Sequence, residues 1–445
     1  MNVLLVSLGC DKNLVDSEVM LGLLKANGHQ VVSEEAQADA VIINTCCFIH
    51  DAKEESIETI LDMALLKKTR NVKLLIVTGC LAERYKEEIF TEIPETDAIL
   101  GTSNYDEIVL LLEKAKHKKH ISRFKELSYL PKNTQERILT TGMHMAYLKI
   151  AEGCNKHCTY CIIPSIRGNY RSFPKEELLA QAESFAKQGI KELLIIAQET
   201  TIYGQDLYGE KHLPKLLKEL ALIEGIEWIR ILYAYPEEIT DELIDVIKTE
   251  KKICHYIDLP IQHCEDEILK RMGRKMGKDR LKEVVQQLRE AIPDIAIRTT
   301  LITGFPGETK KQHEKLMEFV KEMKFERLGV FTYSQEEGTP AAKLDGQLTE
   351  EIKWQRKEEL MLLAQDISLK CGQDMIGLVI TVFIEGYLYE DDIYVGRSYR
   401  DAPDVDGYVF VRADRELMSG DFVDVKITEA KEYDLIGEMI NEHSK

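Results

Sequence analysis

The sequence lacks any apolar run long enough to cross a membrane, and it lacks a recognisable secretion signal. The opening residues, MNVLLV, are too few for a signal peptide and have no basic start. Positive charge is also scarce, because 58 Lys and Arg stand against 77 Asp and Glu, for a net charge of −19. We therefore expect a cytoplasmic protein whose overall charge does not favour nonspecific binding to nucleic acid phosphates.

The cysteines are informative in that context, because structural disulfides are rare in a reducing compartment. The chain has 10 cysteines, and clustered cysteines in such a protein are typical of metal sites or catalytic thiols. The length of 445 residues is more than one ordinary core supports. A prior of about 150 residues per domain predicts roughly three domains.

The first predicted domain covers residues 1–116. Short apolar runs alternate with helical patterns in this segment, which predicts an open parallel sheet with helices on both faces. The expected strands are residues 3–8, 41–44 and 74–78, and the expected helices are 14–26, 51–66 and 105–115. The polar segment 117–137 is predicted to be a linker.

Two further domains follow. Strand and helix patterns alternate six times across the second, residues 140–372, which predicts an incomplete (β/α)6 barrel with its chemistry at the carboxyl ends of the strands. Its expected strands are residues 146–151, 192–197, 228–233, 256–259, 296–302 and 328–331. The third, residues 374–441, has short β-rich runs at 378–385, 392–395, 407–411 and 422–427. These favour a small all-β barrel of about five strands.

Three cysteines follow the first strand of the predicted barrel, in the segment CNKHCTYC at residues 154–161. Cys154, Cys158 and Cys161 can hold an iron-sulfur cubane and leave one iron open to a substrate. The alternative is a zinc site with His157 as fourth ligand. Structural zinc usually has four protein ligands, and no fourth Cys or His stands at finger spacing, so the cluster is favoured.

Another set of three cysteines lies in the first predicted domain; it comes first along the chain and is called the first cysteine set, and Cys154, Cys158 and Cys161 are the second cysteine set. Cys10, Cys46 and Cys80 each come just after a predicted parallel strand, at the edge where open α/β sheets bind ligands. The alternative is three unrelated buried thiols, since free cysteine is often buried. The remaining cysteines lack partners at ligand spacing and are predicted to be packing residues: Cys47, Cys254, Cys264 and Cys371.

The CxxxCxxC spacing, with an aromatic residue before its last cysteine, resembles the radical S-adenosylmethionine superfamily. Two cysteine sets in this order, followed by a small β domain, resemble its methylthiotransferase family over nearly the whole chain. The likeness is carried by SLGCDKN (7–13), DSE (16–18), NTC (44–46), TGCLAERY (78–85), YLKIAEGC (147–154), IIPSIRG (162–168) and GFPGE (304–308). Asp11 and Cys47 depart from it, where proline and glycine are expected.

Within that family the closest likeness is to the type that modifies an aspartate in the twelfth protein of the small ribosomal subunit. This likeness rests on the opening LGCxKN pattern, on LPIQH (259–263) and on GRSYRDAPDVDG (396–407).

The resemblance implies two 4Fe-4S clusters, S-adenosylmethionine and a low-potential electron donor. One cofactor molecule would methylate a sulfur on the open iron of the Cys10, Cys46 and Cys80 cluster. A second would be cleaved at the other cluster, and its radical would take a hydrogen from the β-carbon of the target aspartate.

Three further residues are candidates for binding the cofactor because of their positions. Tyr160 lies within the second cysteine segment, Gln198 ends the second barrel strand, and Gly304 follows the fifth, where a backbone could approach adenine closely. Each has an ordinary alternative, namely a surface tyrosine, a capping amide and a turn glycine. No catalytic side chain is predicted.

The last domain resembles the TRAM domain, which binds RNA in transfer-RNA-modifying relatives. Here residues 374–445 have 7 Lys and Arg against 17 Asp and Glu, a charge that repels phosphate and suits a basic ribosomal protein. The acidic surface expected to recognise that protein is around Glu390-Asp391-Asp392 and Asp401, Asp404 and Asp406. The alternative is that the acidic residues of this domain only keep its surface soluble. Two other functions remain open, a transfer-RNA adenosine methylthiotransferase and a non-catalytic iron-sulfur scaffold, and transfer RNA is the less expected partner.

Overall fold

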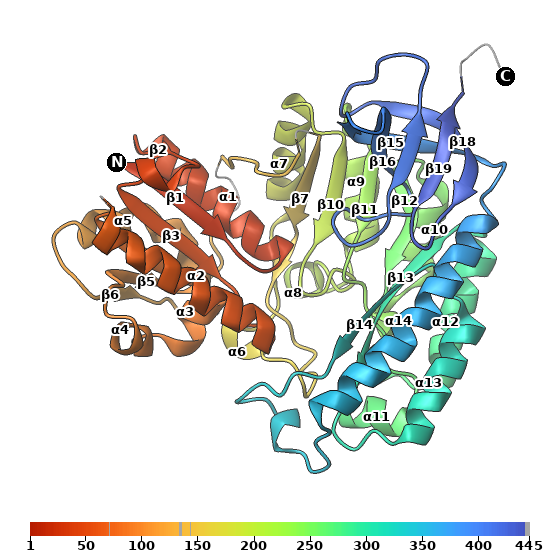
Figure 1. The fold of residues 1–445 in the computed structure, drawn as a ribbon, viewed down its shortest axis with the longest axis horizontal. Coiled ribbons are helices and arrows are strands. Elements are labelled where there is room, and N and C mark those ends of the chain that lie inside the picture. The colour runs from red at the N-terminus through yellow and green to blue at the C-terminus, as the bar shows by residue number, and fades with distance from the viewer. Residues whose placement is uncertain (71, 133–135, 143, 441–445) are drawn as a thin grey trace.

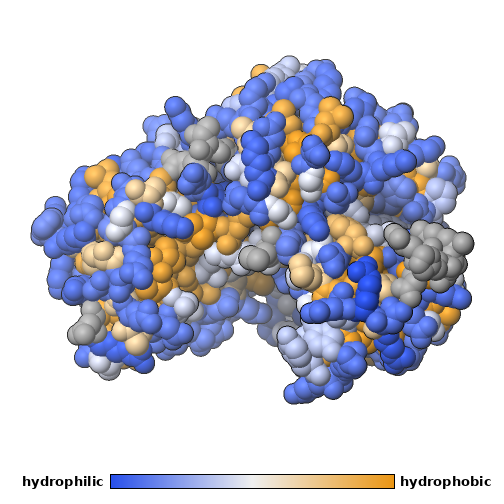
Figure 2. All heavy atoms as spheres, turned by 90° about the horizontal axis from the view of Figure 1, so that it is seen from above, coloured by the Kyte–Doolittle hydropathy of each residue, from blue (hydrophilic) through white to orange (hydrophobic). Residues whose placement is uncertain are grey.

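The computed structural model describes residues 1–70, 72–132, 136–142 and 144–440. An N-terminal α/β domain stands beside a central sheet surrounded by helices, and a β-barrel sits at one end of that sheet (Figure 1). Seen from above, a notch separates the N-terminal lobe on the left from the lobe on the right (Figure 2). Within the described residues, no helix combines the length and the apolar character that crossing a bilayer requires.

The N-terminal domain is built on a parallel sheet, as predicted, but the sheet has six strands where three were expected, in the order β2-β1-β3-β4-β5-β6. Alternate residues of its strands face two separate cores, one under each layer of helices. The strands are β1 (Asn2–Ser7), β2 (Gln30–Val31), β3 (Ala40–Thr45), β4 (Leu74–Gly79), β5 (Ala98–Leu100) and β6 (Ile121–Arg123). The helices are α1 (Asp11–Ala26), α2 (His50–Thr69), α3 (Cys80–Tyr85), α4 (Glu88–Glu92) and α5 (Ile108–Ala115).

The predicted linker was partly wrong. Strand β6 lies inside residues 117–137 and pairs in parallel with β5, so the sheet extends beyond the expected helix at 105–115. Its three residues include one apolar side chain, which is too little for a strand pattern to show in the sequence. Residues 133–135 of the predicted linker lie outside the described part of the chain.

The central sheet is an open array of six parallel strands in the order β14-β13-β12-β11-β10-β7, which confirms the predicted incomplete barrel. Its strands are β7 (Met145–Lys149), β10 (Glu192–Ile196), β11 (Trp228–Ile231), β12 (Ile253–Asp258), β13 (Ala296–Thr303) and β14 (Arg327–Thr332). The main surrounding helices are α7 (Lys175–Lys187), α9 (Leu213–Ala221), α10 (Asp241–Thr249), α12 (Lys278–Ala291), α13 (Lys310–Met323) and α14 (Glu350–Gln373). Side chains such as Leu193 pack under these helices, whereas Leu194 faces inward.

A closed barrel of five strands follows α14, as predicted, in the order β15-β16-β17-β19-β18. The strands are β15 (Val379–Leu388), β16 (Ile393–Ser398), β17 (Val409–Arg412), β18 (Phe422–Ala430) and β19 (Leu435–Met439). Strand β19 was not among the runs expected from the sequence. Residue 441, the predicted end of this domain, lies outside the described residues.

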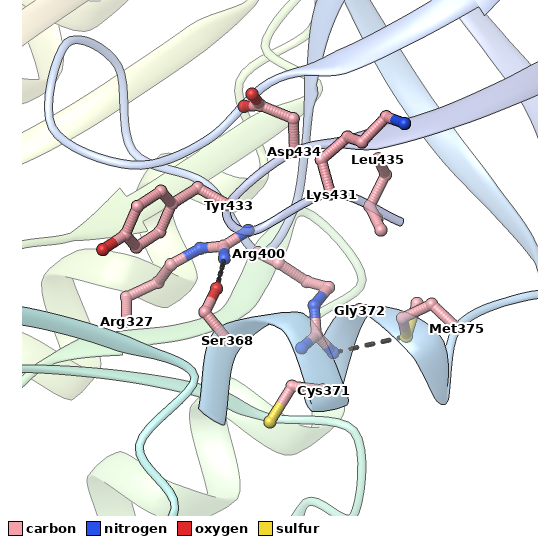
Figure 3. Close-up of a pocket in the computed structure, with 10 residues that line it drawn as sticks. All are labelled: Arg327, Ser368, Cys371, Gly372, Met375, Arg400, Lys431, Tyr433, Asp434 and Leu435. Atoms are coloured by element: carbon pink, nitrogen blue, oxygen red, sulfur yellow. Dashed lines mark hydrogen bonds between the residues drawn. The ribbon is translucent and has the colours of Figure 1, made fainter. Parts of the chain in front are cut away.

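The closed barrel packs on the inward face of the central sheet. Trp228 of β11 lies against Phe383 and Phe422 of the barrel, at ring centroid distances of 6.0 and 5.0 Å. Arg397 of β16 also reaches the start of β10, where it pairs with Glu192. In Figure 1 this barrel lies at the top, away from the segment after β7 that carries the second cysteine set. A narrow crevice between α14 and the barrel holds Ser368, which accepts a hydrogen bond from Arg327 at 3.0 Å (Figure 3).

The acidic residues at 401 and 406 do not form part of an exposed acidic surface, contrary to expectation. Asp401 is buried and pairs with Arg327, while Asp406 lies 3.4 Å from the guanidinium of Arg298 and accepts a hydrogen bond from the Tyr256 hydroxyl. These carboxylates join the last barrel to the central sheet. The sequence could not reveal this because their partners are far away along the chain.

The N-terminal domain completes its core with a segment from beyond the second cysteine set. The short helix α6 (Ile163–Arg167) comes directly after that set. Ile162 and Ile166 are buried in the same core as Leu81 and Ala82 of α3. The two domains are therefore interlocked rather than joined only by a tether.

Candidate active site

The loop after the short strand β8 (Ala151–Glu152) holds the second cysteine set. Gly153 enters it at φ +79°, and a side chain there would overlap the backbone carbonyl of Asn169, so glycine is required. Within the loop, the Cys161 amide donates to the Cys158 carbonyl at 3.0 Å, and the Thr159 amide donates to Met272 at 2.9 Å. These contacts fix the loop at the carboxyl end of the first barrel strand, as predicted.

The thiols of this set form one group in which Cys154 and Cys158 are buried and Cys161 is partly exposed. Cys154 and Cys158 are 6% and 5% exposed. Burial is the main cause that raises the pKa of Cys154 to about 11 and that of Cys161 to about 12, and the neighbouring Cys158 contributes in the same direction. Thiols that resist ionisation in the free protein become stable thiolates when they bind a metal. His157, the alternative zinc ligand, is exposed at φ +53°.

Gln198 and Glu199 stand at the end of β10, next to this loop. The Gln198 amide nitrogen donates to Glu152 at 2.7 Å, whereas its amide oxygen is buried without a hydrogen-bond partner. Glu199 is fully buried, and burial raises its carboxyl pKa to about 7, although Lys156 at 3.4 Å lowers it. One carboxylate oxygen of Glu199 also has no partner. Unsatisfied buried acceptors beside the thiols suit a ligand that brings hydrogen-bond donors, such as an amino acid group.

Glu199 was not predicted as a site residue from the sequence. The available signal was its position, since it is an acidic residue shortly after an apolar strand. Two other residues near the thiols were also missed. The Tyr235 hydroxyl lies 3.8 Å from the Cys158 sulfur, and the Arg274 guanidinium lies 4.4 Å from the centre of the Tyr235 ring. Tyr160 joins this group, because burial and then Cys158 raise its pKa well above the usual value.

Gly304, the third predicted cofactor residue, has a packing reason to be glycine. It lies after β13 at φ +70°, and a side chain there would overlap Lys353 of α14. Its amide donates to Glu308, which also accepts from the Phe305 amide at 3.2 Å and thereby closes the turn. The structure thus accounts for the glycine without reference to a ligand, and its approach to adenine stays a prediction.

The first cysteine set also converges. Gly9 places the loop before Cys10 directly over Cys46, so that a side chain at Gly9 would lie 2.7 Å from the Cys46 sulfur. Cys46 and Cys80 are buried, whereas Cys10 is exposed. Burial raises the pKa of Cys46 and of Cys80, and in both cases Cys10 raises it further. The cysteines at three strand ends therefore share one site, with one thiol open to solvent.

The other cysteines pack in hydrophobic cores. Cys47 lies in the core of the N-terminal domain, Cys254 on the inner side of the central sheet, and Cys264 and Cys371 in or against the core under the outer helices. Across the described residues, no three His, Cys, Asp or Glu side chains are grouped so as to hold a metal ion. The thiols of each set therefore lie near one another, but they are not arranged as the ligands of one metal ion.

Three family models match consecutive parts of the chain. They are the uncharacterised protein family UPF0004 over residues 2–101, the radical SAM superfamily over 148–320, and the TRAM domain over 376–440. A curated protein of Lachnoclostridium phytofermentans, the ribosomal protein uS12 methylthiotransferase RimO, is 59% identical over 98% of this chain and 99% of its own. Its namesake in Thermoanaerobacter is 50% identical over the same shares of both chains. The chain belongs to the RimO family.

Solved structures share the fold with this RimO-family chain. The radical S-adenosylmethionine methyltransferase TsrM of Kitasatospora setae superposes with a TM-score of 0.54 at 13% identity, over 74% of this chain and 72% of that one. The cobalamin-dependent radical enzyme OxsB gives 0.52 at 13% identity, over 82% and 57%. At such identity the likeness concerns the fold alone.

RimO-family membership makes the chain a radical S-adenosylmethionine enzyme, and the superfamily implies a 4Fe-4S cluster and S-adenosylmethionine. Three neighbouring thiols, two of them buried, and the unsatisfied acceptors of Gln198 and Glu199 fit these ligands. The zinc alternative and the non-catalytic scaffold are therefore rejected, and the family name decides against the transfer-RNA alternative.

Proposed function

We propose that this enzyme adds a methylthio group to the β-carbon of an aspartate in ribosomal protein uS12. The proposal is supported by relatives that carry this activity in their name and match the chain almost end to end. The observation that carries it is the presence of two separate cysteine sets, at the carboxyl ends of two parallel sheets that α6 joins. One set suffices to generate a radical, and a second provides a place for the sulfur that is transferred.

Cys154, Cys158 and Cys161 are assigned to a cluster that binds S-adenosylmethionine. When bound, this cluster and cofactor supply a radical that removes hydrogen from carbon. The chain's own residues orient the cofactor and exclude water. Gln198 and Glu199 offer unsatisfied acceptors from the end of β10, and Tyr160 lies within the cysteine loop itself. Gly304 is assigned to the same binding region through its position after β13.

Cys10, Cys46 and Cys80 are assigned to a second 4Fe-4S cluster. Thiolates are the usual ligands of such clusters, and three leave one iron free. The exposure of Cys10 gives this site access to solvent, so an external sulfur donor and a substrate loop can approach it. A low-potential electron donor is required for the other cluster, and the whole reaction is assigned to the cytoplasm, where ribosomes are made.

The last barrel is assigned to recognition of the basic protein substrate. With the side chains of Asp401 and Asp406 buried, the exposed acids that remain include Asp404 and, between β15 and β16, Glu390, Asp391 and Asp392. Tyr389 beside them is 88% exposed and adds an aromatic contact surface. Acidic residues around an exposed tyrosine complement a basic partner and repel nucleic acid phosphate.

Mass spectrometry of uS12 tests the activity. Cells with the intact gene are expected to carry the methylthio mass addition on one aspartate, and cells without it are expected to lack it. Complementation with a chain that carries Cys154→Ala should fail to restore the modification, while Cys371→Ala, which changes a packing cysteine, should restore it. Unmodified uS12 in cells with the intact gene, together with methylthiolated transfer RNA that depends on it, would overturn the assignment.

A further inference from the structure

Arg167 contacts the first cysteine set from the other domain. It ends α6, which starts two residues after Cys161, and its side chain is 2% exposed. Its Nη2 lies 3.6 Å from the Cys80 sulfur and donates a hydrogen bond to the side-chain oxygen of Asn13. A residue that adjoins one cysteine set in the sequence therefore touches a cysteine of the other set in space.

Two carboxylates fix the orientation of this guanidinium. Its Nη1 donates to Asp16 at 2.7 Å and to Glu152 at 3.2 Å. Asp16 belongs to α1 of the N-terminal domain and Glu152 to β8 beside the second cysteine loop, and both are buried. A planar guanidinium held on one edge by carboxylates presents its other edge in a fixed direction. Here that direction is toward Cys80.

Asn13 extends the same arrangement to the other two loops of the set. Its side-chain nitrogen donates to the carbonyls of Leu8 at 3.1 Å and Thr45 at 2.9 Å, close to Cys10 and just before Cys46. Its side-chain oxygen lies 3.7 Å from the Cys80 sulfur. Asn13 is completely buried, so this one amide connects all three cysteine loops and is itself held by Arg167.

We propose that Arg167 is a positioning residue for the cluster of the first cysteine set and acts through the sulfur of Cys80. This inference rests on the proposed function, which places a cluster there. A charged donor next to a ligating sulfur stabilises the thiolate and raises the reduction potential of the cluster. Mutation of a residue that hydrogen-bonds to a metal ligand commonly changes the metal affinity by about 10- to 100-fold. The cluster in the N-terminal domain is thus completed by a residue of the central domain.

Arg171 provides a matched control. It is partly buried and lies four residues after Arg167. Both of its terminal nitrogens donate to the backbone carbonyl of Arg167 at 3.1 Å. Removing its charge changes the same region without removing the donor to sulfur. A purely structural role in joining the domains, by contrast, would not change the potential of the cluster.

The experiment uses the full chain with Cys154→Ala, Cys158→Ala and Cys161→Ala, so that the first set alone holds iron. After anaerobic reconstitution, iron loss to a chelator and the midpoint potential from electron paramagnetic resonance are measured for Arg167→Gln, Arg167→Lys and Arg171→Gln. Arg167→Gln is expected to lose iron at least 10-fold faster and to have a lower potential. Arg167→Lys should be intermediate, and Arg171→Gln should match the parent.

Equal iron loss and equal potentials for Arg167→Gln and Arg171→Gln would overturn the inference. If circular dichroism shows that Arg167→Gln does not fold, Arg167→Lys decides, because an unchanged potential overturns the proposal and a lowered one supports it. If the parent chain binds no iron, the assignment of a cluster to Cys10, Cys46 and Cys80 is overturned, and the inference with it. This outcome is distinct because it appears before any change at Arg167.

Discussion

Arg397 of the last barrel and Glu192 of the central sheet form an ion pair in which neither side chain is exposed to solvent, with 2.6 Å between Nη2 and Oε2. Glu192 is also bound by Arg230 at 2.9 Å. Although burial opposes its ionisation, Arg397 and Arg230 lower the pKa of Glu192 below its usual value. The charged pair therefore ties the barrel to the sheet.

Removing one partner should be costly. Arg397→Met is expected to destabilise the protein by about 3–5 kcal/mol, because it leaves a buried carboxylate with only part of its compensation. Urea unfolding followed by the fluorescence of Trp228, which packs against the barrel, provides the measurement. Lys431→Met, which changes an exposed pair with Glu429, should shift stability by less than about 0.5 kcal/mol. Equal effects of the two variants would contradict the prediction.

Iron content tests the assignment of two clusters. The anaerobically reconstituted chain should hold close to eight irons, since each set of thiolates supports one cubane with about four. Combined alanine variants of Cys154, Cys158 and Cys161 should retain about half of the iron and should not cleave S-adenosylmethionine. The packing cysteines Cys254 and Cys264 serve as controls. Full iron retention in the combined variant would show that these thiols are not ligands.

Changing the first set should separate the two parts of the reaction. Combined alanine variants of Cys10, Cys46 and Cys80 are expected to cleave S-adenosylmethionine but to transfer no methylthio group, because the proposed function assigns radical generation and sulfur delivery to different clusters. Product analysis by mass spectrometry with 5′-deoxyadenosine quantified in the same samples distinguishes these outcomes. Normal transfer by this variant would make the first set ordinary buried thiols.

Glu199 should give the free protein a pH-dependent stability. Burial raises its pKa from 4.5 to about 7, so its contribution is fully present below pH 4.5 and is lost as the pH rises through about 7. From pH 4.5 to 8 the wild type should therefore lose up to about 3 kcal/mol relative to Glu199→Gln, which does not titrate. Urea unfolding at several pH values, with the exposed Glu224→Gln as control, measures this. A difference between wild type and Glu199→Gln that does not change with pH would refute the prediction.

The acidic turn between β15 and β16 should speed association with uS12. Glu390→Lys with Asp391→Lys is expected to slow binding and to reduce its dependence on salt, because exposed charges are screened over about 8 Å at physiological ionic strength. Stopped-flow association rates provide the measurement. Glu416→Lys with Glu432→Lys makes the same charge change at other exposed sites of the barrel. Identical slowing by both pairs would mean that net charge alone matters, and tight transfer-RNA binding by the unmodified chain would contradict the role.

Long apolar strands could be predicted from the sequence, and short ones could not. The patterns at 41–44 and 74–78 correspond to β3 and β4, which are fully buried, and every strand expected in the central sheet was found. The two residues of β2 and the three of β5 gave too little pattern, because such strands depend on neighbours already in the sheet. The convergence of Cys10, Cys46 and Cys80 was predictable because parallel strands end at a common edge. The other three cysteines lie within one short segment, residues 154–161.

Contacts between domains were beyond such reasoning. Nothing local distinguishes the buried Asp401 from the exposed Asp391, because burial here depends on Arg327 in another domain. The same holds for Arg167, whose partners come from α1, β8 and α3. Glu199 illustrates a missed local signal, since it directly follows a residue that was selected.

The core that the N-terminal domain shares with α6 cannot be completed while only the first domain has been synthesised. Ribosomes release a chain from its amino end, at about 5–20 residues per second in bacteria and eukaryotes. The sheet is complete at Arg123, but Ile166 is made later, after a delay of about 2–9 s. During that time the nascent domain has all three cysteines of the first set, an unfilled apolar core and no Arg167. Under the proposed function, stable loading of the first cysteine set is therefore expected only after synthesis of the segment that contains the other three cysteines.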